Sequence, residues 1–96
     1  MRKITQEAFT AWKSGKSFKK SNTRVTPEGS VFLHGNQIVR VTENAVLVSD
    51  GGFGWSKTTR ERLSPWITFS RKQGQPLMDG NPYESGTWVK LTRKTW

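Results

Sequence analysis

The residues of this chain best suited to chemistry with a partner are its basic and aromatic side chains. Sixteen Lys and Arg residues stand against seven Asp and Glu residues, which gives a net charge of +9 over 96 residues, and five residues are Trp. Phosphates bind such cations and nucleic-acid bases stack on such rings, so the composition predicts attraction to polyanions, above all nucleic acid. In the alternative interpretation the rings belong to a core and the charges only keep the protein soluble.

The positive charge is concentrated in two segments of the chain. Residues 1–26 carry seven basic residues and one acidic residue, residues 27–50 have a net charge of −2, and residues 51–72 return to +4. If both basic segments lay on one face, they would form a groove that follows a phosphate backbone, but the sequence leaves open whether they do. The candidate binding residues are Lys13, Lys16, Lys19, Lys20, Arg24, Phe53, Trp55, Lys57, Arg60 and Arg62.

The second basic segment follows a glycine-rich stretch. Residues 51–58 read GGFGWSKT, which is one residue away from the phosphate-binding loop of nucleotide hydrolases. That loop needs glycine where Ser56 stands and a parallel sheet behind it, so we expect no nucleotide hydrolysis. A weaker hypothesis is that this loop and the helix after it hold a phosphate or sulfate, with Lys57 and Arg60 nearby. The alternative is a plain loop.

No set of residues in the sequence forms a convincing catalytic or metal site. His34 is the only histidine, there is no cysteine, and the seven carboxylates are scattered singly. One histidine cannot build a metal site, and no acid–base pair or activated nucleophile can be assigned. We therefore expect a protein that is not an enzyme and that has no cofactor and no metal, with His34 as a polar residue beside a turn.

The spacing of apolar side chains predicts the elements that position these residues. Residues 5–14 predict a short amphipathic helix, with Thr5 as its N-cap and Gly15 as its end. The period then changes to two, which predicts strands at 23–26, 30–34, 37–42, 45–49, 66–70, 76–78 and 87–92. Gly35 and Asn36 would form a type II′ hairpin turn, and a short helix is expected near residues 58–64. The fold class is then α+β: one N-terminal helix packed on an antiparallel sheet of five or six short strands, in a single domain of residues 1–96.

The aromatic residues divide by their position in these elements. Those at apolar-phase positions are expected in the core: Phe9, Trp12, Phe32 and Phe69. Those in polar or glycine-rich surroundings are candidates for stacking: Phe18, Phe53, Trp55 and Trp66. For these four the alternative is a small apolar cluster that covers the sheet. Trp88, in the closing strand, could face either side.

Four short stretches resemble a family of small bacteriophage-encoded proteins. They are residues 18–25 (FKKSNTRV), 33–36 (LHGN), 58–63 (TTRERL) and 86–89 (GTWV), and together they extend over most of the chain. Ser64 and Pro65 stand after the third stretch, where the family usually has Asn, a departure that concerns the end of the short helix. The family has no established activity, so the resemblance implies no functional residues. It implies expression inside an infected bacterial cell, to act on host or phage machinery.

Two functions are compatible with the sequence. The leading hypothesis is a small non-enzymatic protein that binds DNA or RNA through a basic face, mainly by electrostatics, with Trp55 or Phe53 stacking on bases. The alternative is a phage-encoded inhibitor or modulator that binds an acidic host protein or a nucleoprotein complex, in host defence or transcription. No apolar run exceeds four residues, which is too short to span a membrane, so we expect the protein in the cytoplasm of the host bacterial cell. The oligomeric state is left open.

Overall fold

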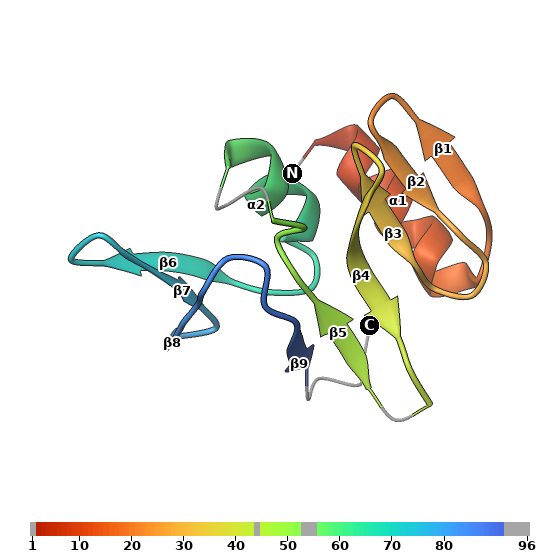
Figure 1. The fold of residues 1–96 in the computed structure, drawn as a ribbon. Helices are drawn as coiled ribbons and strands as arrows, with labels where there is room; N and C mark the ends of the chain where they lie inside the picture. Colours follow the sequence, from red (N-terminus) through yellow and green to blue (C-terminus); the bar gives the residue numbers. More distant parts are fainter. Residues whose placement is uncertain (1, 44, 53–55, 92–96) are drawn as a thin grey trace.

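A six-stranded antiparallel sheet, with a helix packed on one of its faces, forms the larger part of the fold (Figure 1). The computed structural model describes residues 2–43, 45–52 and 56–91. The strands lie in the order β1-β2-β3-β4-β5-β9, so only the last pair joins strands that are not consecutive. These elements are α1 (Lys3–Ser14), β1 (Phe18–Lys20), β2 (Thr23–Val25), β3 (Val31–Leu33), β4 (Asn36–Val41), β5 (Val46–Val48) and β9 (Val89–Leu91).

A smaller sheet projects from the main one as a hairpin with a short third strand (Figure 1). It consists of β6 (Phe69–Lys72), β7 (Gln75–Met78) and β8 (Asn81–Pro82), and the short helix α2 (Lys57–Leu63) precedes it in the chain. The α+β class, the N-terminal helix, the second short helix and the antiparallel sheet are therefore confirmed. The strands expected at 66–70 and 76–78 pair with each other, so they form this separate sheet and do not extend the main one.

Helix α1 begins two residues before its predicted start. Its N-cap is Arg2, which has an extended backbone and provides no side-chain cap. Thr5 was the predicted N-cap, and that prediction is wrong. Thr5 lies within the helix, and its buried hydroxyl forms hydrogen bonds with the α2 residues Glu61 and Arg62. The predicted end is confirmed, since Gly15 adopts the left-handed conformation with φ of 67°.

Arg62 connects α2 to both the sheet and α1. Its side chain is only 5% exposed. Nε donates to Thr23 Oγ1 at 2.9 Å, and Nη1 donates to Thr5 Oγ1 at 3.1 Å and to Glu61 Oε1 at 3.3 Å. Burial lowers the pKa of Arg62, and the Glu61 carboxylate opposes this shift. Arg62 was among the predicted binding residues, and that prediction is wrong. Its guanidinium is enclosed by the fold and cannot meet a phosphate.

Three aromatic rings pack together where α1 meets the segment after α2. Trp66 is 1% exposed, and its ring lies edge-on to Phe9 and Trp12 at centroid distances of 5.1 and 5.3 Å. Phe9 and Trp12 pack against the core as expected, and the Trp12 indole donates to the Gly29 carbonyl at 2.9 Å. Trp66 was a candidate for stacking on a base, and that prediction is wrong because the ring is enclosed. Phe18, another candidate, is half-buried against the same core.

The inner face of the main sheet is apolar across its whole width. Residues opposite one another on neighbouring strands share a face, and one such row runs through Phe18, Val25, Val31, Val39, Val48 and Val89. A bulge in β4 adds Ile38 to the buried set. Phe32 lies between the buried residues Val31 and Leu33 and therefore faces the other side of the sheet. The expectation that Phe32 belongs to the core is wrong.

Two local features of the sheet differ from the prediction. No strand was predicted at residues 18–20, but β1 pairs with β2 along its whole length. The β3–β4 turn falls one residue earlier than expected, because Leu33 pairs with Asn36. Its central residues His34 and Gly35 have φ of 52° and 83°, and positive φ at both positions is the property of a type I′ turn, not of type II′.

Candidate nucleic-acid interface

Strand alternation divides the first basic segment between the two faces of the sheet. Lys20 faces α1, where its Nζ lies 3.5 Å from Glu7 Oε1. Lys19 and Arg24 form an opposite pair of the β1–β2 ladder and lie on the other face, which neither α1 nor α2, the two helices of the described residues, covers. Adjacent lysines in the sequence thus have different surroundings, and only Lys19 is directed to the uncovered face.

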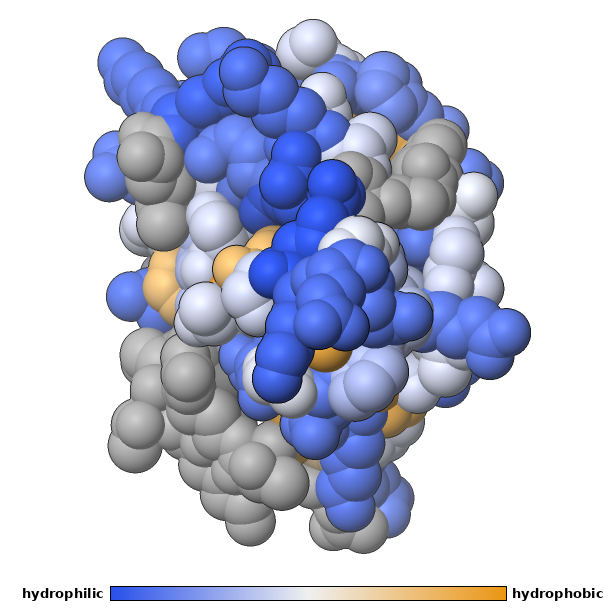
Figure 2. Space-filling view, turned by 90° about the vertical axis from the view of Figure 1, so that its left-hand side faces the viewer, coloured by the Kyte–Doolittle hydropathy of each residue, from blue (hydrophilic) through white to orange (hydrophobic). Residues whose placement is uncertain are grey.

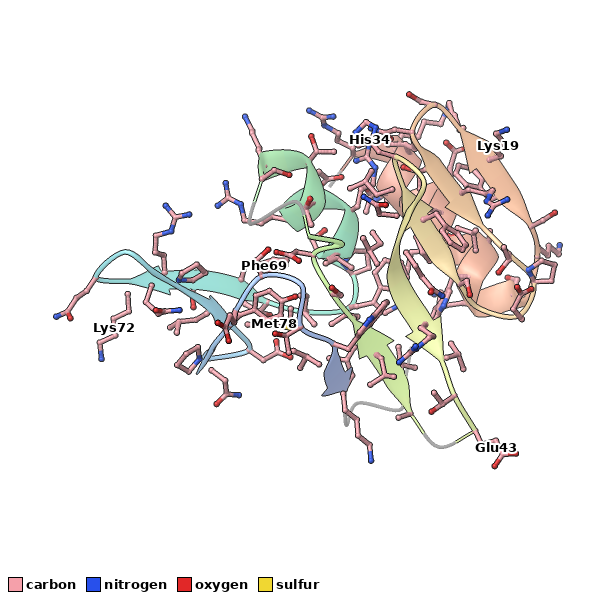
Figure 3. The ribbon with its side chains drawn as sticks, in the orientation of Figure 1. Lys19, His34, Glu43, Phe69, Lys72 and Met78 are labelled. Carbon is pink, nitrogen blue, oxygen red and sulfur yellow. The ribbon has the colours of Figure 1, made fainter. Side chains whose placement is uncertain are left out.

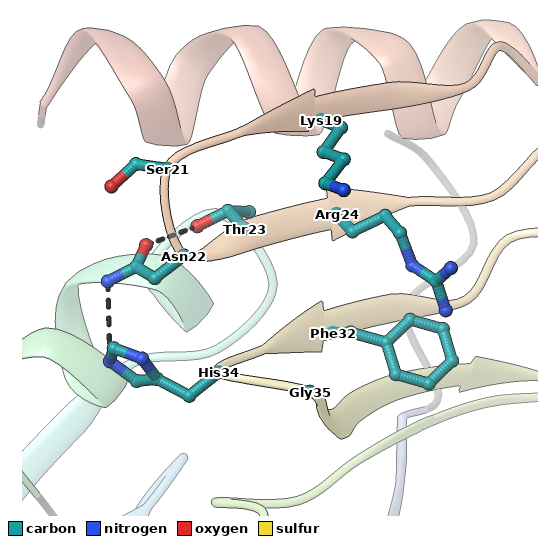
Figure 4. Close-up of a pocket in the computed structure, with 8 residues that line it drawn as sticks. All are labelled: Lys19, Ser21, Asn22, Thr23, Arg24, Phe32, His34 and Gly35. Atoms are coloured by element: carbon teal, nitrogen blue, oxygen red, sulfur yellow. Dashed lines mark hydrogen bonds between the residues drawn. The ribbon is translucent and has the colours of Figure 1, made fainter.

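Lys19 and Arg24 continue into a row that includes an aromatic ring. Phe32 is opposite Arg24 in the β2–β3 ladder, and the Arg24 guanidinium carbon lies 4.5 Å from the centre of the Phe32 ring. These side chains line a hollow of about 680 Å³ (Figure 4). Asn22 and His34, from the neighbouring hairpin turns, lie at the end of this hollow, with Asn22 Nδ2 3.4 Å from His34 Nε2. The hollow therefore combines cations, one ring and polar groups.

The same face carries a second pair of a cation and a ring. Arg40 projects from β4 between Val39 and Val41, and its guanidinium carbon lies 4.8 Å from the centre of the Trp88 ring. Trp88 lines a separate hollow of about 360 Å³ together with Gln37, which is opposite Phe32 in the β3–β4 ladder. Lys90 is exposed on β9, in the row that passes through Leu47 to Arg40.

Acidic side chains are missing from these strands. None of the six strands of the main sheet contains Asp or Glu over its described residues. Both ion pairs of the described part of the chain, Lys20–Glu7 and Arg62–Glu61, lie off the uncovered face. We call this surface the open face, and it comprises Lys19, Arg24, Phe32, Arg40, Trp88 and Lys90.

A buried carboxylate holds the segment before Trp88. Asp50, two residues after β5, is fully buried and accepts hydrogen bonds from the Gly52 N–H at 2.9 Å, the Gly86 N–H at 2.8 Å and the Ser85 hydroxyl at 2.7 Å. Tyr83 is buried beside it and donates its hydroxyl to the Thr87 carbonyl at 2.6 Å. Burial raises the pKa of Tyr83. Residues 83–87 are thereby fixed to the end of β5, and Trp88 follows directly.

The comparisons with known proteins identify a family. The family model of the Kyanoviridae Gp96 protein matches residues 1–90. The chain belongs to this phage protein family. The resemblance to small bacteriophage-encoded proteins is thereby confirmed. No curated protein and no solved structure matches the chain significantly.

The remaining predicted binding residues of this Gp96-family protein lie away from the open face or outside the described residues. Lys13 is on α1, with its Nζ 4.9 Å from the centre of the Phe9 ring, and Lys16 is exposed just after that helix. Lys57 and Arg60 are exposed on α2, and Arg60 lines a small hollow of about 110 Å³ with Arg71. Phe53 and Trp55 lie outside the described residues.

The two basic segments thus contribute to different parts of the molecule. In Figure 3, Lys19 lies on one side of the molecule and Lys72, at the tip of the β6–β7 hairpin, lies on the opposite side. Figure 2 shows the side from which that hairpin projects, and it is largely hydrophilic, with only small separate hydrophobic areas.

The glycine-rich stretch ends in a helix cap. Ser56 is the N-cap of α2, and its Oγ accepts from the Thr59 N–H at 3.1 Å. That N–H is one of the donors that a phosphate or sulfate would need, so the cap competes with the anion-binding hypothesis for this loop.

Sequence reasoning did not select the open-face residues Arg40 and Lys90, and it left the side of Trp88 undecided. One signal for Arg40 was present, since it alternates with Val39 and Val41 along β4. Among the described residues, no group of three or more His, Cys, Asp or Glu could hold a metal ion. No described helix has the length and apolar character that crossing a membrane requires.

Proposed function

We propose that this protein binds nucleic acid through the open face and catalyses no reaction. The observation that carries the proposal is the alternation of cations and aromatic rings on an uncovered sheet, with Arg24 against Phe32 and Arg40 against Trp88. Cations that neutralise phosphates next to rings that stack on bases are the two requirements of a nucleic-acid surface. The proposal places the protein in the cytoplasm of the infected bacterial cell, where phage and host nucleic acid are accessible.

The electrostatics of the open face support this proposal. Its four cations, Lys19, Arg24, Arg40 and Lys90, are exposed, and the four strands that carry them have no acidic residue. A surface whose cations form no ion pairs with carboxylates of the same protein attracts phosphates at long range and binds them with release of counterions. Rings beneath guanidinium groups keep those groups in place and add a stacking surface.

Fluorescence anisotropy with a labelled oligonucleotide over a series of salt concentrations tests the proposal. With four phosphates neutralised, log K should fall against log[salt] with a slope of about −3. Removing one open-face cation, in Arg24→Ala or Lys90→Ala, should weaken binding and reduce this slope by about 1. Lys72→Ala, at the tip of the β6–β7 hairpin, is the matched control and should leave binding unchanged. Absence of binding at low salt, or equal losses in the control and the open-face variants, contradicts the proposal.

The alternative function, an inhibitor or modulator that binds an acidic host protein or a nucleoprotein complex, would use the same cations. The two proposals differ in what nuclease treatment does. A complex recovered from bacterial lysate that dissociates on nuclease treatment supports direct nucleic-acid binding. A stoichiometric protein partner that survives nuclease, and that the Arg24→Ala variant no longer retains, supports the alternative and contradicts the proposal.

A further inference from the structure

We infer that the open face binds single-stranded nucleic acid, with bases stacked at two separate positions, Phe32 with Arg24 and Trp88 with Arg40. This inference rests on the proposed function and specifies the substrate class of the same surface. Three observations carry it: the breadth of the sheet, the location of each ring in its own hollow, and the polar groups beside the first ring.

The breadth of the sheet does not suit a double helix. Six strands at the usual spacing of about 4.8 Å extend over about 24 Å, whereas the major groove of B-DNA is about 12 Å wide and admits one helix or a two-stranded ribbon. The open face is one broad face of this sheet. The side chains of Phe32 and Trp88 are therefore too short to reach the base edges inside a groove. Unpaired bases, in contrast, can lie on it directly.

Each ring of the open face lines a hollow large enough for a base. The hollow at Phe32 has a volume of about 680 Å³ and the hollow at Trp88 about 360 Å³. Both hollows are wide open to solvent, so a base can lie against the ring from outside. A base in a duplex is stacked on its neighbours and cannot enter such a hollow, whereas a base of a single strand can.

The residues around the first ring match the two properties of a nucleobase, an apolar face and a polar edge. The Phe32 ring and the Arg24 guanidinium supply planar surfaces, and bases stack on both kinds of plane. The Asn22 amide lies at the end of the same hollow, where its Nδ2 is 3.4 Å from His34 Nε2 and its Oδ1 accepts from the Thr23 hydroxyl. Its second N–H can donate to a base edge. A surface that only attracted phosphates would need neither the ring nor the amide.

The distance between the two rings sets the length of strand that engages both. Phe32 is on β3 and Trp88 directly precedes β9, so their backbones lie three strand intervals apart across the sheet, or about 14 Å. Gln37 lies between them, opposite Phe32 on β4 and in the hollow of Trp88. The single strand therefore crosses the β-strands of the protein, and its phosphates pass the cations at Lys19 and Arg40.

The experiment compares three labelled probes at the same salt concentration: an oligothymidine of about 12 nucleotides, an RNA strand of the same length, and a duplex with the same number of phosphates. The single strands should bind at least about tenfold more tightly than the duplex. Phe32→Ala and Trp88→Ala should each weaken single-strand binding about 5- to 150-fold, as loss of one stacked base predicts. The salt slope should stay unchanged in both variants, because neither removes a charge.

Leu47→Ala is the matched control for these variants, because it truncates an apolar side chain of the same face that has no ring. It should bind like the original protein. Phe32→Leu keeps most of the apolar volume, so a folding defect would not explain its result. It should lose binding like Phe32→Ala. Duplex binding as tight as single-strand binding, or ring variants that bind like Leu47→Ala, overturns this inference while the proposed function stands. Failure of every probe to bind overturns the proposed function itself.

Discussion

Replacing Arg62 should destabilise the fold far more than replacing its exposed neighbour Arg60. Arg62 is 5% exposed and donates three hydrogen bonds, to Thr23, Thr5 and Glu61. Arg62→Met keeps a long apolar side chain but removes every donor. Two buried threonine hydroxyls and one partly buried carboxylate then lose their charged partner.

The magnitude follows from these contacts. A hydrogen bond to a charged group contributes about 1.5–3 kcal/mol, and breaking a buried ion pair costs about 3–5 kcal/mol. Glu61 keeps 20% side-chain exposure and can turn toward water, so its part of the loss is smaller. We expect Arg62→Met to lower the free energy of unfolding by about 3–4 kcal/mol, a large fraction of the roughly 5–15 kcal/mol typical of a small domain.

Urea unfolding followed by circular dichroism measures this loss. Arg60→Met is the matched control, because Arg60 is exposed on the same helix, and it should change the free energy of unfolding by no more than about 0.5 kcal/mol. The double variant Thr5→Val with Arg62→Met should lose less than the sum of the single variants, since both remove one interaction. Equal unfolding midpoints for Arg62→Met and Arg60→Met would refute the reasoning.

Two further predictions concern the turn between β2 and β3 and the alkaline limit of stability. Gly29→Ala should lower the free energy of unfolding by about 2–3 kcal/mol, because Gly29 has φ of 99° and a Cβ there would lie 2.6 Å from Val41 Cγ2. In thermal unfolding, Gly35→Ala is the control with a similar φ and open space, and an equal loss there would contradict the role of the Val41 contact. The raised pKa of Tyr83 means that the unfolded chain loses the phenolic proton first, so this contribution to stability is complete below pH 10.0 and is lost as the pH rises above it. Tyr83 is the only tyrosine, so tyrosinate absorbance reports its ionisation directly, and a midpoint at or below the ordinary value, or an unchanged alkaline loss in Tyr83→Phe, would contradict the prediction.

The parts of the fold that follow from local patterns could be predicted from the sequence. The helix end at Gly15 and most strands of the main sheet depend on the left-handed preference of glycine and on alternating apolar residues. Strand β1 could not be found in this way, because two of its three residues are lysines and it becomes a strand through pairing with β2. The helix start was misplaced for a similar reason: the partner of Thr5 is Arg62, 57 residues further along the chain.

The candidate site was predictable in its residue types but not in its geometry. The excess of lysine and arginine is visible in the composition, yet burial of Arg62 depends on Thr5 and Thr23, which are distant in sequence. The partnership of Arg40 with Trp88 depends on the crossover that places β9 beside β5. Alternation along β2 and β3 did contain the information that Arg24 and its neighbouring ring face away from the core.

The open face also bears on the choice between a binding surface and charges that serve only solubility. Solubility requires charge in contact with water, as Lys72 provides at the tip of the β6–β7 hairpin, and it gains nothing from a ring beside the charge. On the open face, half-buried rings lie against exposed guanidinium groups at Phe32 and Trp88, with no acidic residue in the strands that form it. Keeping apolar rings on an uncovered face has a cost in water, and a partner that stacks on them offsets that cost. The pairing of ring and cation, more than the net charge, is what favours a nucleic-acid partner.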